Sequence, residues 1–214
     1  MDRADKQPRA YRAPRREAAA ARTRTAVARA AAESFATRGW SATTMRLVAQ
    51  EAGVSLKTVE ALHGTKAALL SAAVDFAIRG DAEPVEMPRR PVVEQMERAS
   101  TATRFLDLHA AHVTGINERS AAVAAAVEQA AAADPTVAVL WGHMNANRTY
   151  AVRWATDLLL SLPGRRRGLV RADVEATFWV AVDWATYRTL TAQARLSPAE
   201  FEGWLRRLYR RAFL

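Results

Sequence analysis

Few side chains in this sequence have the types and spacing that chemistry requires. His109 and His112 are three residues apart, so on a helix they would share a face, and His143 could supply a third metal ligand. The chain has no Cys, and no His-Glu pairing accompanies these histidines. We therefore expect no metal, and we assign the histidines to pocket lining or ordinary packing.

A single cation interrupts a long apolar face. In the segment 135–162 this face carries Arg148 at its middle. Burying a cation is costly unless it is paired or bound. Three readings are open: an ion pair with Asp183, a stem that reaches solvent, or contact with an anionic group of a ligand. The candidate ligand-binding residues are His109, His112, Met144, Arg148, Trp179 and Asp183.

The groups that a catalytic centre needs do not converge in the sequence. It has no Gly-rich phosphate loop after a strand, no Ser-centred elbow, and no paired carboxylates in a motif context. Asp134 precedes Pro135 and is interpreted as a helix cap rather than an acid catalyst. We expect a protein that is not an enzyme and that holds no cofactor.

Composition predicts the elements that must position these residues. Of 214 residues, 50% are apolar, and alanine, the best helix former, is abundant, whereas alternating β-branched runs are missing. An all-α fold follows. The basic N-terminus has no apolar signal core, and no segment reaches the roughly 20 apolar residues of a membrane span. With no Cys, a cytoplasmic protein that does not associate with membranes is expected.

The positive charge is concentrated near the N-terminus. The formal net charge is +9, and residues 1–64 hold 12 Lys and Arg against 6 Asp and Glu. A polyanion such as double-stranded DNA is a natural partner for such a segment. A solvated Arg-rich arm is the other reading.

Capping signals divide the chain into helices. Residues 1–21 contain two prolines and are expected to form a flexible basic arm. The proline-rich stretch 80–91 is the main interruption. A capping box is expected at Ser197 and Glu200. Helices are predicted at about 22–38, 45–52, 56–62, 66–78, 92–117 with a break near 100, 120–132, 135–162, 173–192 and from 198 onward.

The stretch MRLVAQEAGVSLKTVEAL, residues 45–62, predicts a helix-turn-helix. Two helices of about two turns each flank Gly53, and such short helices are marginal without external bracing. Phe35 and Leu69 or Leu70 are the expected braces. The expected inner seam is Val48, Ala52, Val54, Val59 and Leu62. The expected projecting face is Leu56, Lys57, Glu60 and Ala61.

The run from Thr23 to Ile78 resembles the N-terminal domain of the TetR family of bacterial transcriptional regulators. The likeness rests on Phe-Ala-Thr-Arg-Gly-Trp, then Ala-Thr-Thr, Val-Ala-Gln-Glu-Ala-Gly-Val-Ser, and Gly-Thr-Lys followed by Leu-Leu. It implies a DNA-binding domain at 22–66, with phosphate contacts from the Thr43–Thr44 region and Lys66. The implied DNA-binding residues are Thr43, Thr44, Arg46, Ser55, Leu56, Lys57, Thr58, Glu60, Ala61, His63 and Lys66.

The sequence departs from the family pattern at the expected interface. The family commonly has an acid at the position of Leu47, aromatic residues near Glu60 and Ala61, and Phe where His63 stands. His63 either contacts the DNA backbone or replaces a core aromatic residue. Glu60 either accepts a hydrogen bond from cytosine N4 or pairs with Lys57.

Residues 67–214 resemble the family more loosely, through DLHAAHV, ADPTVAVLW and SPAEFEGWL. The resemblance implies a helical domain that binds a small effector and forms a homodimer, so that a repressor is released from its operator. The segment 173–192 is apolar nearly all round, which indicates cover by a second subunit together with the final helix, or a central place in a monomer core. A constitutive DNA-binding protein whose second domain only dimerises is the alternative function. The expected dimer interface is Val174, Phe178, Ala181, Val182, Ala185, Phe201, Trp204, Leu205 and Leu208.

Overall fold

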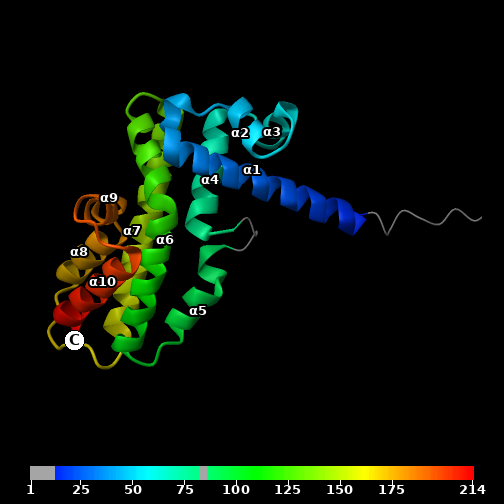
Figure 1. The fold of residues 1–214 in the computed structure, drawn as a ribbon. Helices are drawn as coiled ribbons and strands as arrows, with labels where there is room; N and C mark the ends of the chain where they lie inside the picture. Colours follow the sequence, from blue (N-terminus) through cyan, green and yellow to red (C-terminus); the bar gives the residue numbers. More distant parts are fainter. Residues whose placement is uncertain (1–12, 82–85) are drawn as a thin grey trace, which may run out of the picture.

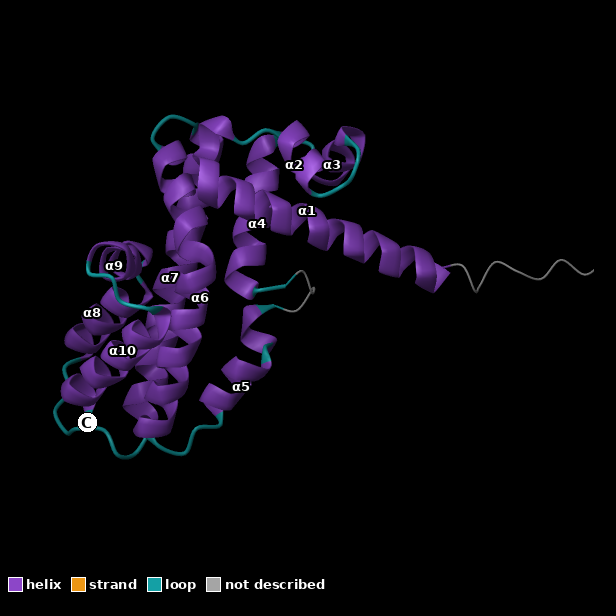
Figure 2. Cartoon of the chain, in the orientation of Figure 1, coloured by secondary structure: helices purple, strands orange, loops and turns teal. Residues whose placement is uncertain are grey.

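The computed structural model of this protein describes residues 13–81 and 86–214. Over these two ranges the chain is helical and contains no strand (Figures 1 and 2). The predicted all-α class is therefore confirmed. No helix within the described ranges is long and apolar enough to cross a bilayer.

Helix α1, Ala13–Ala42, is longer than predicted. Gly39 breaks its helical geometry with φ 73° and ψ −175°, as the expected stop at this glycine requires. Its start is nine residues earlier than the predicted one, so the expectation of a flexible arm is wrong for residues 13–21. Four consecutive alanines at 18–21 favour helix there. Residues 1–12 of the expected arm lie outside the described residues.

The next three helices lie close to their predicted bounds. They are α2, Met45–Glu51; α3, Leu56–His63; and α4, Lys66–Arg79. Beyond α4, residues 82–85 of the proline-rich stretch lie outside the described residues. A short 3-10 turn η2, Met87–Arg89, and helix α5, Pro91–Glu97, follow.

Helix α6, Ala102–Ala131, is a single element of 30 residues. The break near residue 100 is confirmed, because Thr101 caps α6 by accepting a hydrogen bond from the Arg104 amide. The predicted interruption between 117 and 120 is wrong. Asn117 and Ser120 are buried, so packing on both sides carries the helix through these polar residues.

The C-terminal part contains one more break than expected. Helix α7, Pro135–Ser161, starts at the predicted Asp134 cap. The predicted helix 173–192 is divided into α8, Arg171–Val182; α9, Trp184–Arg188; and a π-helical turn η3, Thr189–Gln193. Asp183 causes the division, because its carboxylate accepts from the Thr186 amide and begins a new helix. Helix α10, Pro198–Phe213, has the predicted Ser197–Glu200 capping box.

Helix α6 forms the centre of the molecule. It packs against α1 and α4 at the end that carries α2 and α3, and against α7, α9 and α10 along its length. One apolar core runs through all of these helices without interruption. Figure 1 shows α4 leading from the short helices α2 and α3 alongside α6, with α8, α9 and α10 on the opposite side. Helix α6 is therefore in direct contact with both α1 and α4.

Candidate nucleic-acid interface

Two side-chain caps begin the short helices α2 and α3. The Thr44 hydroxyl accepts from the Leu47 amide at 3.1 Å, and the Ser55 hydroxyl accepts from the Thr58 amide at 3.1 Å. Between them Gly53 has a φ of 67°, a left-handed conformation that other residues rarely adopt. Each helix therefore starts and stops because of residues within this segment.

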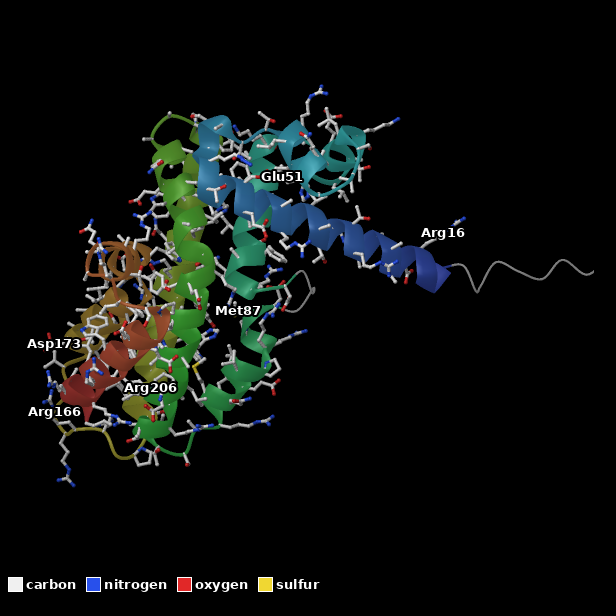
Figure 3. All side chains as sticks on the ribbon, in the orientation of Figure 1. Arg16, Glu51, Met87, Arg166, Asp173 and Arg206 are labelled. Atoms are coloured by element: carbon white, nitrogen blue, oxygen red, sulfur yellow. The ribbon has the colours of Figure 1, made fainter. Side chains whose placement is uncertain are left out.

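The bracing of α2 and α3 comes from α1 and α4. Phe35, Val48, Val59 and Leu69 have no exposed surface and belong to one core cluster. Glu51, at the end of α2, lies against α1, where it accepts hydrogen bonds from the Ser34 hydroxyl and, at 2.8 Å, from Arg38 (Figure 3). The predicted braces Phe35, Leu69 and Leu70 are confirmed as buried core residues, and Glu51 adds a polar tie that was not predicted.

The outer face of this unit is polar and exposed. Lys57, Glu60 and Ala61 of α3 are exposed, and so are Thr44, Arg46 and Ser55 at or near the helix starts. Thr58 is half-buried, and its hydroxyl lies 2.8 Å from that of Ser55. A helix that carries such a face on a rigid support can enter a major groove.

Three residues are not placed as predicted. Thr43 is fully buried, and its hydroxyl donates to the carbonyl oxygens of Ser34 and Gly39 at 3.1 and 2.8 Å, so its side chain closes the α1–α2 connection and is unavailable to phosphate. Leu56 is half-buried against the core rather than projecting. Leu62, expected in the inner seam, is 37% exposed.

His63 ends α3 in a half-buried position. Its Nε2 atom is buried and has no hydrogen-bond partner among the described residues. Burial lowers the pKa of His63, which favours the neutral ring at neutral pH. A neutral, inward-facing ring favours the reading in which His63 replaces a core aromatic residue.

Lys66 is positioned by an aromatic ring at the start of α4. Its Nζ atom lies 4.3 Å from the centroid of the Trp40 ring, a cation–π distance. Burial lowers the pKa of Lys66, and the negative charge of Asp134 at the start of α7 opposes this shift. Trp40 was not predicted as a site residue, although it lies in the Arg-Gly-Trp motif.

The Arg148 side chain forms the predicted ion pair. Its Nη2 atom donates to Asp183 at 2.9 Å, and its guanidinium carbon lies 5.0 Å from the Trp179 ring centroid and 4.6 Å from that of Trp184. Burial lowers the pKa of Arg148, and Asp183 opposes this. Asp183, Trp179 and Arg148 are thus brought together, and the buried Nε atom of Arg148 has no hydrogen-bond partner among the described residues.

The histidine candidates have surroundings of their own. His109 is buried against Phe178, and its Nδ1 atom lies 2.9 Å from the Tyr209 hydroxyl. Burial lowers the pKa of His109 to about 3 and that of His112 to about 4. Met144 is buried and His143 is exposed. Within the described ranges no three His, Cys, Asp or Glu side chains are placed to hold a metal ion.

Most residues of the predicted dimer interface lie in the core of a single chain, where α8 and α10 pack against each other and α10 packs on α6. The buried members are Val174, Phe178, Ala181, Phe201 and Leu205. Val182, Trp204 and Leu208 are half-buried, and Ala185 is exposed.

Comparisons with known proteins agree with this geometry. Residues 28–73 match the model of bacterial regulatory proteins of the tetR family. A putative TetR-family transcriptional regulator from Rhodococcus sp. shares the fold with a TM-score of 0.65 and 14% identity, over 89% of this chain and 98% of that one. NalD, described as the secondary repressor of the MexAB-OprM multidrug efflux pump in Pseudomonas aeruginosa, gives 0.63 and 19%, over 90% and 96%.

No curated protein sequence matches this chain significantly. The family match covers the capped and braced pair α2–α3 and the start of α4, where the exposed polar face was found. The structural likeness extends from there over most of the chain. Residues 28–73 of this chain are therefore similar to the N-terminal domain of bacterial regulatory proteins of the tetR family, and they hold the helix-turn-helix formed by α2 and α3.

Proposed function

We propose that this protein is a repressor that binds operator DNA as a homodimer and releases it when a small effector binds. The observation that carries the DNA-binding half of the proposal is the exposed face of α3. Lys57, Glu60 and Ala61 project from a helix that is capped by Ser55 and fixed to α1 through Glu51. Such a helix can enter the groove without losing its own conformation, which keeps the cost of binding low.

The exposed side chains divide into two kinds of DNA contact. Lys57 and Glu60 are placed to meet base edges, where Lys can donate to guanine and Glu can accept from cytosine N4. Arg46 and Lys66 are cations at the borders of the face and suit phosphate oxygens, which fix position without reading sequence. The hydroxyls of Thr44 and Ser55, and Ala61, complete the face. Leu56 and His63 are half-buried beneath it, and the half-buried Thr58 has its hydroxyl against that of Ser55.

A homodimer is needed because two recognition helices about 34 Å apart read half-sites one DNA turn apart. The surface left free on α8 and α10 supports this role. Trp179 and Val180 of α8 and Trp204 and Leu208 of α10 keep apolar surface outside the chain's own core. A second copy would bury this surface, which includes Trp204 and Leu208 of the interface expected from the sequence and adds Trp179 and Val180.

Helix α4 connects the two functions. It starts beside the DNA-facing unit with Lys66, and its last carbonyl oxygens are held by the second domain. Arg119 of α6 donates to the carbonyls of Ala77 and Ile78 at 3.1 and 3.2 Å. Arg90 donates to that of Arg79 at 3.4 Å. A ligand that displaces α6 would therefore shift α4 and change the spacing of the two recognition helices.

A groove between α5 and α7 is our candidate effector site. It has a volume of about 590 Å³, and its wall combines the aromatic rings of Tyr150 and Trp154 with the charged groups of Glu97, Arg153 and Asp157. Aromatic surface with a few polar groups is typical of small-molecule sites. The groove is open to solvent, and this openness favours the constitutive DNA-binding protein as the second candidate function.

Footprinting on DNA upstream of the protein's own gene tests DNA binding. We expect protection of two half-sites, and loss of sequence preference in the double variant Lys57→Ala, Glu60→Ala. Arg167→Ala, an exposed change in the α7–α8 loop, is the matched control and should bind as the wild type does. Unchanged protection by the double variant would refute the assignment of α3.

The effector and dimer proposals have separate tests. A panel of small hydrophobic and charged compounds should include one that lowers DNA affinity at fixed salt; if none does, the constitutive function is supported.

Val180→Glu should convert a dimer to a monomer in sedimentation, whereas Val139→Glu on α7, where Val139 is 59% exposed, should leave the dimer unchanged. A Val180→Glu protein that still sediments as a dimer would place the interface elsewhere.

A further inference from the structure

The first part of α1 extends further than the core requires. Between residues 16 and 42 the first buried side chain is that of Val27, and residues 16–22 are exposed over two full turns. Because α1 begins at Ala13, the residues before Val27 form a rod of about 21 Å at 1.5 Å per residue. Figure 1 shows this rod, residues 13–26, leaving the body on the side where α2 and α3 lie. Packing against the core therefore does not explain its length.

The residues of the rod themselves stabilise its helical conformation. Ala18 to Ala21 favour helix, and the hydroxyls of Thr23 and Thr25 donate back to the carbonyls of Ala19 and Ala21 at 3.1 and 3.0 Å. These two hydroxyls therefore donate within their own helix. The exposed arginines are the side chains of the rod that can contact another molecule.

The charge of the rod has one dominant sign. Arg16, Arg22 and Arg24 are exposed, Glu17 is the acidic residue among 13–26, and the first turn has none. At 100° per residue these arginines point in different directions, so the rod is positive around its circumference. The amide end of a helix is itself positive, and cations there raise the potential further instead of neutralising it. Figure 3 shows Arg16 near the tip.

We infer that the rod lies along duplex DNA outside the half-site read by α3, with its arginines on phosphate oxygens. This inference rests on the proposed function. Two observations favour DNA as the occupant: a polyanion complements the charge, and the rod is continuous with the proposed interface. The same helix holds α2 through Ser34 and Arg38, which bond to Glu51, so the rod moves with α3 as one body.

The length of the rod determines how much DNA it can contact. A rod of about 21 Å spans about six base pairs at 3.4 Å per step. DNA affinity should therefore depend on flanking sequence length, but not on its base sequence, because phosphate contacts carry no sequence information. A half-site trimmed at its last base contact would leave these arginines without phosphates.

The test compares two lengths of the footprinted duplex. One probe ends at the outermost base contacts, and the other has ten more base pairs at each end. Wild-type protein should bind the longer probe at least tenfold more tightly. The triple variant Arg16→Gln, Arg22→Gln, Arg24→Gln should bind both probes equally, since Gln keeps the helix propensity and removes the charge. The control triple variant Arg89→Gln, Arg167→Gln, Arg211→Gln removes three exposed charges elsewhere and should behave as wild type.

Salt dependence gives a second readout. The slope of log Kobs against log salt should fall by about 0.9 for each phosphate that the rod variant no longer neutralises. Equal affinity and equal slope for the rod variant and the wild type on the longer probe would overturn the inference. A rod variant that sediments as a monomer would overturn it too, because the rod would then serve self-association. Failure of the wild type to bind either probe would instead refute the proposed function.

Discussion

The two halves of this molecule differ in where their charged and polar residues lie. In the DNA-binding unit, α2 and α3 pack on the common apolar core, Thr43 is buried at the α1–α2 connection, and Lys57, Glu60 and Arg46 remain outside. In the C-terminal domain, α6 carries polar groups into the interior: His109 meets the Tyr209 hydroxyl at 2.9 Å, and Asn117 donates to the Ala181 carbonyl at 3.3 Å. The charged side chains named in the DNA-binding unit are therefore exposed, whereas the polar side chains named in the C-terminal domain are buried.

This difference separates two kinds of stability. Removing one large aromatic side chain from an apolar core costs about 3–5 kcal/mol of stability. A buried polar network holds its groups only while every partner is in place, and it responds to protonation. The Ser120 hydroxyl, for example, accepts from Trp184 Nε1 at 2.9 Å, whereas the Thr114 hydroxyl has no partner among the described residues. Substitutions in each half, and a change of pH, can test this contrast.

The largest expected effect is in the apolar unit. Phe35→Ala removes a fully buried ring from the core that braces α2 and α3. We expect a loss of about 3–5 kcal/mol in the free energy of unfolding, together with loss of DNA binding. Urea titration measures the first, and Tyr150→Ala, at a side chain that is 66% exposed, is the control and should change stability little. Full DNA affinity in a Phe35→Ala protein would show that α2 and α3 need no such brace.

Acid should destabilise the C-terminal domain before it destabilises the DNA-binding unit. The folded-state pKa values of His109 and His112 are lowered to about 3 and about 4, so the unfolded chain binds protons first as pH falls. Stability should therefore decrease from about pH 6.5 downward, by on the order of 2 kcal/mol per histidine by pH 4.5. Unfolding followed at each pH measures this loss, and the double variant His109→Gln, His112→Gln should flatten the profile. An equally steep profile in that variant would locate the acid response elsewhere.

Arg119→Met tests the connection between the halves. It removes two hydrogen bonds to the last carbonyls of α4 and should cost about 1–2 kcal/mol. Amide exchange near Ala77 and Ile78 should accelerate, while exchange in α3 stays slow. Arg104→Met, an exposed change on the same helix, is the control. Unchanged exchange at the end of α4 would show that Arg119 does not hold it.

The smallest effects compare two caps. Ser55→Ala and Thr101→Ala each remove a side-chain acceptor from a helix start and should each cost about 1 kcal/mol in thermal unfolding. The Ser55 change should also weaken DNA binding, because α3 begins there, whereas the Thr101 change should not. Equal effects of the two substitutions on DNA affinity would contradict the proposed difference between the two halves.

Local signals in the sequence predicted most of the helix starts. The caps at Asp134 and Ser197 could be read directly, because each cap bonds to an amide two or three residues away. The choice between Thr43 and Thr44 could not, since it depends on carbonyls of Ser34 and Gly39 in another helix. The same distinction explains Trp40, whose contact with Lys66 is tertiary.

Longer-range features were predicted less well. No Gly or Pro lies at the helix break at Asp183, and the apolar pattern continues across it. The cover of the segment that contains Val174 and Phe178 was assigned to a partner subunit together with the final helix, and that final helix, α10, packs there. An apolar stripe shows that a face is covered and does not identify what covers it.

Amide hydrogen exchange with and without the footprinted duplex tests the central claim most directly, because it locates the DNA on the protein. We predict that protection on binding is confined to residues 44–66 and to the exposed part of α1, and that the buried face of α6 is unchanged. Protection centred on α8 and α10, with α3 unaffected, would contradict the account.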